Sequence, residues 1–286
     1  MISFTNNCDG VHDDSLDVRF TKACDNDCAF CCERGGMKAK PMNVDALIQS
    51  TISSRKGTAL VLGGEPLLFP EELLAYVSGI RPFLKEIYVT TSLPKEAFTE
   101  ENYPLFCQIM EVINGLNVSL QHYKWKKNNK ILKASSNHNR FDLLKEKILP
   151  KWAGKVRVSI NLVKGGIDKK WKLEKFLKKC QRIGVRHIKI NELQGCPKLY
   201  VSYEDICKKK FPSPYAHGCQ TEIKMKCAKK LRITLKRSCF MAERSRKATK
   251  ADLKKLRYKK KTGLYETVQV VAYEDGMLSN GWITEN

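Results

Sequence analysis

The sequence predicts an α/β protein whose main part is a partial (β/α)6 TIM-like barrel, followed by a smaller C-terminal α+β extension. Six short apolar runs rich in β-branched residues recur along the first two thirds of the chain. Amphipathic or polar stretches separate the runs, and strands that alternate with helices pair in parallel through right-handed crossovers. The predicted strands are residues 16–20, 59–62, 86–90, 116–120, 156–163 and 185–190.

The stretches between these strands supply the predicted helices. Residues 172–183 show the clearest pattern, with five apolar side chains at helical spacing. The other predicted helices are residues 71–80, 96–113 and 141–148. In an α/β barrel the chemistry takes place at the C-terminal ends of the strands, and the loops there hold the unusual residues of this sequence.

The pattern changes near residue 196, so we expect a barrel domain at residues 10–195 and a C-terminal unit at residues 196–286. Prolines interrupt helical patterns in the second part. Residues 231–235 and 238–241 predict a short hairpin, and residues 265–273 alternate as a strand. We interpret the C-terminal unit as a cap over the mouth of the barrel.

Composition narrows the class of protein. Of 286 residues, 42% are hydrophobic and 29% charged, which is typical of a globular chain. No apolar run approaches the roughly 18 residues that a membrane span needs, and no secretory signal is visible at the start. We therefore expect a cytoplasmic protein without a membrane partner. Its twelve cysteines would then be thiols or metal ligands rather than disulfides.

Positive charge is concentrated in the second half of the chain. Lys and Arg number 52 against 30 Asp and Glu, a net charge of +22. The net charge is −6 over residues 1–121, +15 over residues 122–206, +17 over residues 207–262 and −4 over the last 24. This asymmetry indicates an anionic partner, such as a nucleotide, RNA or an acidic peptide. A lysine-rich surface that serves solubility alone is the alternative.

A cysteine-rich loop follows the first predicted strand. Cys24, Cys28 and Cys31 lie within eight residues, so that three thiolates can surround one metal cluster. A cluster of four irons and four sulfides usually takes four cysteines, and three ligands leave one iron open. Zinc is the alternative, although zinc sites usually show paired cysteines and a fourth ligand.

The cysteine spacing and a second motif together resemble the radical S-adenosylmethionine (radical SAM) superfamily. The pattern is C-x3-C-x2-C after a first strand, with an aromatic residue, Phe30, before the third cysteine. Gly63-Gly64-Glu65-Pro66 at the end of the next strand matches the GGEP motif of that superfamily in sequence and order. The layout of the later strands resembles the subgroup with auxiliary clusters that includes the GTP cyclase of molybdenum-cofactor biosynthesis.

The resemblance covers residues 15–195 and implies a chemistry. Cys24, Cys28 and Cys31 would ligate a [4Fe-4S] cluster, and SAM would bind its open iron. An external electron donor such as flavodoxin or ferredoxin would supply one electron, which cleaves SAM to a 5′-deoxyadenosyl radical that abstracts a substrate hydrogen. The cofactors perform this step, and the protein positions them.

The resemblance also implies roles for residues at the strand ends. The GGEP glycines would let the backbone approach the ligand, and Glu65 would lie near the SAM amino group. Phe30 would pack beside the adenine, with an ordinary core position as the alternative, and Ser92 is either a ligand contact or a helix cap. The predicted cofactor-binding residues are Phe30, Gly63, Gly64, Glu65, Pro66, Ser92, Ser119, Asn161 and Asn191.

A second set of cysteines lies near the C-terminus. The segment containing Cys227 and Cys239 resembles the auxiliary-cluster hairpin of the cyclase, and Cys219 precedes it. The seven residues between Cys219 and Cys227 depart from the cyclase pattern, as does the absence of its double-glycine tail, and both put the cyclase activity in doubt. A second iron–sulfur cluster, with Cys196 or Cys207 as a further candidate ligand, zinc, or unliganded thiols are the open alternatives.

Three functions remain open at this point. The first is a radical SAM enzyme acting on a nucleotide or an RNA base, and the second is a radical SAM enzyme modifying a ribosomally made peptide. The third, from another class, is a nucleic-acid-binding redox sensor with an iron–sulfur cluster. The segment 122–127 interleaves aromatics with lysines, which suits stacking on bases, and a solvated loop with lysine stems over Trp125 is its alternative.

Overall fold

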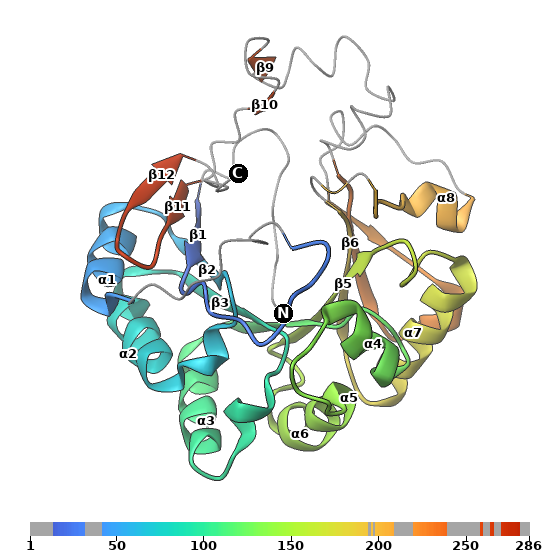
Figure 1. Cartoon of the computed structure of the whole chain (residues 1–286), viewed down its shortest axis with the longest axis horizontal. Coiled ribbons are helices and arrows are strands. Elements are labelled where there is room, and N and C mark those ends of the chain that lie inside the picture. Colours follow the sequence, from blue (N-terminus) through green and yellow to red (C-terminus); the bar gives the residue numbers. More distant parts are fainter. Residues whose placement is uncertain are drawn as a thin grey trace.

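Six parallel strands form the centre of the sheet in chain order. They are β1 (Ser15–Arg19), β2 (Thr58–Leu62), β3 (Glu86–Thr91), β4 (Gly115–Ser119), β5 (Val156–Leu162) and β6 (His187–Glu192). The computed structural model describes residues 14–31, 42–193, 196, 198–208, 220–238, 258–259, 264–265 and 270–280. Figure 1 shows the strands as an inner arc inside an outer arc of helices, with both arcs open on one side. The predicted partial barrel is confirmed, and its sheet is not closed.

Strands from the C-terminal segment extend this sheet on both edges. β8 (Arg232–Lys236) pairs in parallel with β6, and β7 (Gln220–Ile223) pairs antiparallel with β8. On the other edge β11 (Val270–Ala272) pairs in parallel with β1, and β12 (Leu278–Asn280) follows antiparallel. The division of the chain at residue 195 stays a prediction, and the strands beyond it continue the barrel sheet.

The predicted hairpin between residues 231–235 and 238–241 is wrong in its partner. Both edges of β8 are occupied, one by β6 and the other by β7, so no edge is left for a following strand. Residues 239–241 lie outside the described part of the chain. The strand predicted at residues 265–273 is described at its two ends, as β10 (Leu264–Tyr265), which pairs with β9 (Tyr258–Lys259), and as β11.

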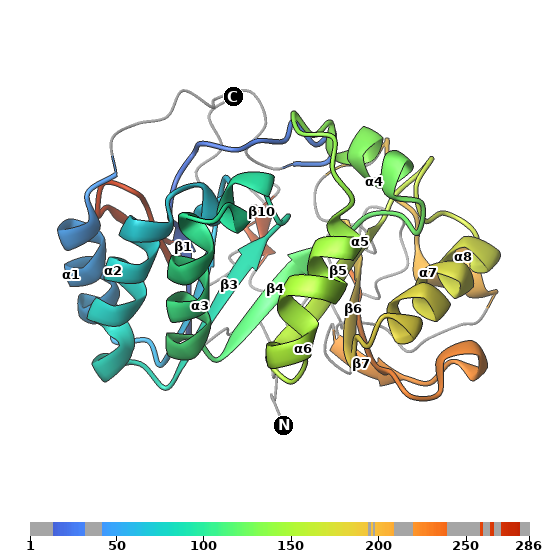
Figure 2. The ribbon, with the colours of Figure 1, turned by 90° about the horizontal axis from the view of Figure 1, so that it is seen from below.

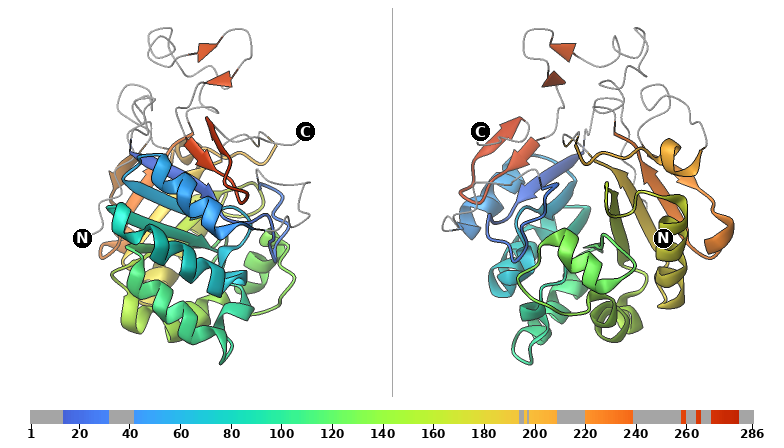
Figure 3. Two further views of the ribbon diagram at one scale, coloured as in Figure 1. Left: turned by 90° about the vertical axis from the view of Figure 1, so that its left-hand side faces the viewer. Right: turned by 45° about the vertical axis from the view of Figure 1, so that its right-hand side comes forward.

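Helices cover the outer face of the sheet, as Figure 2 shows from below. In the left view of Figure 3, α1, α2 and α3 lie side by side over that face. The helices are α1 (Val44–Ser53), α2 (Pro70–Ile80), α3 (Asn102–Val112), α4 (Trp125–Leu132), α5 (Arg140–Leu143), α6 (Leu149–Trp152), α7 (Lys170–Arg182) and α8 (Tyr203–Cys207). Short 3-10 turns occur at Pro66–Leu68, Arg81–Phe83, Lys95–Phe98 and Lys226–Ala228, and a π-helix at Leu144–Ile148 continues α5.

The strands alternate between an apolar outer face and a polar inner face. Residues such as Val18, Val61 and Val89 are fully buried in the core under the helices. Their neighbours along each strand point to the inside of the arc because side chains of a strand alternate. Strands of parallel sheets are usually apolar on both faces, so a polar inner face needs another reason. The buried polar residues at inner positions include Asp17, Asn117, Arg157, His187, Lys189 and Thr234.

Candidate functional site

The cysteine loop, residues 20–31, follows β1 at the C-terminal end of the sheet. It is braced by the end of α4 and the segment that follows this helix. Asp27 donates its backbone N–H to the Leu132 carbonyl at 3.1 Å, and Ser135 donates its backbone N–H to the Asp25 carbonyl at 2.8 Å. The loop backbone is therefore fixed by main-chain hydrogen bonds to a part of the chain about a hundred residues away in sequence.

The GGEP turn packs directly against the cysteine loop. A Cβ on Gly64 would lie 2.2 Å from the Ala23 carbonyl oxygen and 2.7 Å from that of Thr21, and Gly64 has a φ of +54°. Glu65 donates its backbone N–H to the same Ala23 carbonyl at 2.8 Å. A Cβ on Gly63, which has a φ of +81°, would lie 2.5 Å from Arg19 Cγ and 2.9 Å from Arg19 Cα in β1. Approach to the ligand stays a prediction for these glycines, and the structure adds a second reason: Gly64 lets the two motifs touch, and Gly63 lets the turn pack on β1.

Glu65 fastens this turn to the end of β3. Its carboxylate accepts hydrogen bonds from Thr91 Oγ1 at 2.7 Å and from the Ser92 backbone N–H and Oγ at 2.6 and 2.8 Å. It also accepts from the Leu67 N–H at 3.2 Å, at the start of the 3-10 turn that Pro66 begins. Burial raises the pKa of the Glu65 carboxyl to about 7, although these hydrogen bonds act to lower it. Glu65 is 1% exposed, so this carboxylate serves the protein's own framework.

Arg140 joins three parts of the site from below. Its side chain is fully buried, and its Nε donates to the Ser92 carbonyl at 2.6 Å while Nη1 donates to Asn129 Oδ1 at 2.7 Å. Its Nη2 lies 3.4 Å from both Asp25 Oδ2 and Asn26 Oδ1 on the cysteine loop. The guanidinium thus holds the loop, the end of β3 and α4 in one arrangement.

Ser92 completes the link between the two motifs. Its Oγ accepts a hydrogen bond from Asn26 Nδ2 at 2.8 Å and donates to Glu65 Oε2 at 2.8 Å. The helix-cap interpretation of Ser92 is not what the structure shows, because Pro94 stands at the cap position of the next 3-10 turn. A continuous path of side chains therefore connects the cysteine loop, β3 and the GGEP turn.

The three thiols of the loop influence one another. Burial, and next the neighbouring thiols of Cys31 and Cys24, raise the pKa of Cys28 to about 12, and burial raises the pKa of Cys24 to about 11. A bound metal reverses such shifts because a cation favours thiolates, so the donor set fits an iron–sulfur cluster.

In the described residues no three His, Cys, Asp or Glu side chains converge closely enough to hold one metal ion. A four-iron cluster is wider than an ion, and its ligands stand farther apart. The zinc alternative for the cysteine loop therefore gains no support from the described part of the chain.

Three other predicted contacts lie at or near the C-terminal ends of neighbouring strands. Ser119, Asn161 and Asn191 are half-buried at the ends of β4, β5 and β6, and Asn191 Nδ2 donates to Ser159 Oγ at 2.8 Å. Phe30 is half-buried within the cysteine loop. Their placement matches the expectation, and their contacts with a cofactor stay predictions.

The C-terminal cysteines are described only in part. Cys227 lies in the 3-10 turn before β8, and Cys207 ends α8. Both influence the Tyr203 hydroxyl, whose pKa is raised first by burial and then by Cys207 and Cys227. Cys219 and Cys239 lie outside the described residues, so the auxiliary cluster stays a prediction.

The aromatic rings of the segment after β4 are in contact with one another and with lysine side chains. The rings of His122 and Tyr123 stack at 4.4 Å, and the Lys175 ammonium lies 5.8 Å from the Tyr123 ring. The Lys126 ammonium lies 5.6 Å from the ring of Trp125, which begins α4. These contacts favour the interpretation in which lysines cover the aromatic faces. They do not favour the alternative in which the rings stack on bases.

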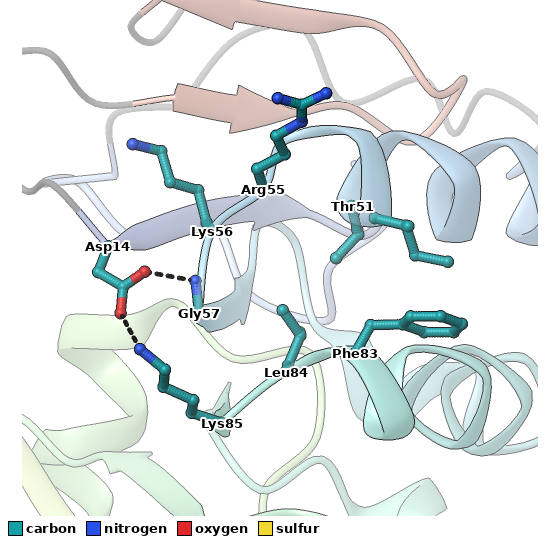
Figure 4. A pocket seen from close by; sticks show the side chains of 9 residues that line it. Asp14, Thr51, Arg55, Lys56, Gly57, Phe83, Leu84 and Lys85 are labelled. Carbon is teal, nitrogen blue, oxygen red and sulfur yellow. Dashed lines mark hydrogen bonds and ion pairs between the residues drawn. The ribbon is translucent and has the colours of Figure 1, made fainter.

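A shallow pocket of about 260 Å³ lies at the opposite end of the sheet (Figure 4). Asp14, before β1, accepts from the Gly57 N–H at 2.7 Å and from Lys85 Nζ at 3.4 Å, and Phe83 lines the same pocket. These residues precede β1, β2 and β3, so the pocket is remote from the strand ends where barrel chemistry occurs.

Comparisons with known proteins agree on the fold. The chain is similar to Streptococcus suis SuiB, with a TM-score of 0.57 and 14% identity over 92% of this chain and 59% of that one. The same protein bound to its precursor peptide SuiA gives 0.53 and 13% over 92% and 58%. A radical SAM methyltransferase from Sphaerobacter thermophilus gives 0.53 and 16% over 78% and 65%. No family model and no curated protein matches the sequence.

The chain has the fold of the radical SAM enzymes, as its motifs predict. It spans less than two thirds of the length of each of these solved structures. In the described part of the chain, no helix is long and apolar enough to cross a membrane.

Arg140 and Asn26 are site residues that the sequence did not predict. Asn26 lies inside the cysteine motif, and its place beside the ligands was a usable signal. No sequence signal marks Arg140, because it is far from the cysteine motif in sequence and begins a short helix among many other basic residues. Only the fold shows that it lies beneath the cysteine loop.

Proposed function

We propose that the chain is a radical SAM enzyme. Cys24, Cys28 and Cys31 would hold a [4Fe-4S] cluster, and the GGEP turn with the ends of β4 to β6 would hold SAM. When bound, the cluster and SAM supply reductive cleavage to methionine and a 5′-deoxyadenosyl radical, which takes a hydrogen atom from the substrate. One observation carries the proposal: the cysteine loop and the GGEP turn touch through Gly64.

The protein's own residues have distinct parts in this function. Glu65 and Ser92 keep the GGEP turn and β3 in register, and Arg140 holds the loop against both. Asn161 and Asn191, neighbours in register on β5 and β6, would contribute amide groups near the C-terminal ends of these strands. Preorganised polar groups of this kind orient a ligand without rearranging during the reaction.

The test is anaerobic reconstitution with iron and sulfide, followed by dithionite reduction with SAM. We expect about four irons per chain, or about eight if the C-terminal cysteines also bind a cluster, and release of 5′-deoxyadenosine. Cys24→Ala should lose both iron and cleavage. Cys107→Ala, in α3 on the outer side of the sheet, is the matched control and should keep both. Iron without cleavage would instead support the redox-sensor function.

The substrate class is a further part of the proposal. The positive second half of the chain favours an anionic substrate, either a nucleotide or RNA base or an acidic peptide. Modification of a peptide is the second candidate, supported by the similarity to SuiB bound to its precursor peptide. Binding of a short RNA and of an acidic peptide, each measured against salt concentration, separates the two, since release of counterions gives RNA the steeper dependence.

A further inference from the structure

Lys189 lies at the middle of the polar inner face of the sheet. It is the third residue of β6, with Ser159 of β5 on one side and Thr234 of β8 on the other. Only 9% of Lys189 is exposed. Asn191 is two residues farther along the same strand and on the same face, toward the end where the cysteine loop lies.

The polar neighbours of Lys189 are engaged by one another, while Lys189 is not. Arg157 Nε donates to Asn117 Oδ1 at 2.9 Å, and the His187 ring contacts Thr234 Oγ1 at 3.0 Å. Among the described residues Lys189 makes no hydrogen bond or ion pair through its side chain. Lys189 is therefore a largely buried residue whose amine has no partner in the part of the chain that is described.

The charges around Lys189 are unbalanced. Burial lowers the pKa of Lys189 well below its usual value, and the positive charges of Lys236 and Arg157 lower it further, against the carboxylate of Asp17. Burying an amine that has no hydrogen-bond or ion-pair partner is costly, and an unbranched apolar side chain such as methionine would fill the same space without that cost. An anion placed here would supply the missing charge and accept the free donors of the amine.

We propose that Lys189, with the positive charge of Lys236, binds a compact anionic group of the substrate, a carboxylate or a phosphate, on the inner face of the barrel. The identification of this anion as part of the substrate rests on the proposed function, whereas its binding does not. The anion would be held inside the barrel below the strand ends, so that the rest of the substrate extends toward Asn191 and the cysteine loop. Lys189 is thus a determinant of substrate specificity.

The test measures anion binding by the reconstituted full chain, with inorganic phosphate and acetate as the two probes. We expect wild type to bind one of them and Lys189→Met to lose at least tenfold in affinity. Lys189→Arg should keep most of the affinity because it keeps the charge, and Lys236→Met should lose less than Lys189→Met. Lys145→Met, an exposed position on the outer helices, is the control and should bind as wild type does.

A second measurement separates binding from a structural role. In the absence of anions, Lys189→Met should unfold at the same denaturant concentration as wild type or a higher one, because it removes an amine that is largely buried and has no partner. A loss of stability in that variant, equal affinity in wild type and Lys189→Met, or no binding of either probe by wild type would overturn the proposal. Phosphate alone would indicate a phosphorylated substrate, and acetate alone an acidic side chain.

The outcome is independent of the enzyme assignment. SAM cleavage by wild type is measured on the same preparation without any anion. Anion binding that depends on Lys189 but occurs without cleavage would leave the site intact and reject the radical SAM function. Cleavage without such binding would do the opposite.

Discussion

At the scale of single residues, the site depends on contacts that allow no substitute. Gly64 has no side chain where any Cβ would meet the backbone of the cysteine loop. The Glu65 carboxylate accepts hydrogen bonds from four donors of the surrounding protein. A motif that the sequence marks for its ligand thus also fastens the ligand loop to the sheet, and a change in it should affect stability and iron binding together.

Gly64→Ala should destabilise the cluster-free protein and weaken iron retention. The added methyl group would meet the Ala23 carbonyl, and overpacking of this kind costs about 1–3 kcal/mol. Gly165→Ala is the matched control, since Gly165 also has a positive φ, +82°, but its Cβ would meet nothing within 4 Å. Denaturant unfolding and iron analysis of both variants measure the difference. An equal loss of stability and iron in both variants would mean that backbone strain, rather than the contact with the cysteine loop, causes the effect.

Arg140→Met should lower the free energy of unfolding by more than Gly64→Ala does. It would leave the Asp25 carboxylate, which is almost fully buried, without the cation 3.4 Å away. Breaking a buried ion pair on one side costs about 3–5 kcal/mol. Arg186→Met, at an exposed position before β6, should be neutral. The free energy of unfolding and the electron paramagnetic resonance spectrum of the reduced cluster are the readouts. An unchanged spectrum and an unchanged stability would show that Arg140 does not position the loop.

The residues of the site differ in how well their role can be predicted from the sequence. Cys24 and Gly64 stand in short patterns whose chemistry can be argued from spacing. Ser92 and Asn161 are placed by their position at strand ends, which requires only the order of strands. Arg140 and Lys189 cannot be found in this way, because their meaning comes from what surrounds them in space and lysine and arginine are abundant throughout the second half.

At the scale of elements, the strands were easier to predict than the helices. Each of the strands β1 to β6 is a short buried run and falls within about two residues of its prediction. The helix predicted over residues 96–113 is divided, with the 3-10 turn Lys95–Phe98 before α3. α1 was missed although Asn43 caps it, its side chain accepting from the Ala46 N–H. α4 is mostly polar, and the sequence analysis predicts no helix at its position.

The end of β6 fastens the C-terminal segment to the barrel. Glu192 accepts hydrogen bonds from Tyr200 Oη at 3.1 Å, the Tyr203 N–H at 2.8 Å and the Ser238 N–H at 2.9 Å. These hydrogen bonds hold β8 and β7 at the edge of the sheet, although no βαβ pattern in the sequence predicts strands there. Their place beyond β6 could not be read from the sequence, because pairing between distant strands leaves no local pattern.

Glu192→Ala should loosen this segment and leave the rest of the sheet intact. Hydrogen bonds to a buried charged acceptor are worth about 1.5–3 kcal/mol, so amides of α8 should exchange about tenfold faster or more. Hydrogen exchange resolved by peptide measures this, with Glu146→Ala, an exposed glutamate, as control. Faster exchange spread evenly over β1 to β6 would contradict a local role.

At the scale of the whole molecule, the fold buries neutral histidines among positive charges. Burial first, and then Arg157, Arg232 and Lys189, lower the pKa of His187 to about 3. Burial likewise lowers the pKa of His122 to about 4 and that of His138 in the same direction. A polar, cationic inner face therefore has a cost that depends on pH.

His187→Gln should make the protein more resistant to acid. Because the folded pKa lies below the unfolded value near 6.5, the unfolded chain takes up the proton first as pH falls, and stability is lost below about pH 6.5. The loss reaches at most about 1.4 kcal/mol per pH unit for this one group. Glutamine does not titrate and can keep a hydrogen bond to Thr234. Urea unfolding at pH 7, 6, 5 and 4 compares the variant with wild type. Their difference in free energy of unfolding should grow steadily toward pH 4 in favour of the variant, whereas parallel curves would show that His187 is protonated in the folded protein.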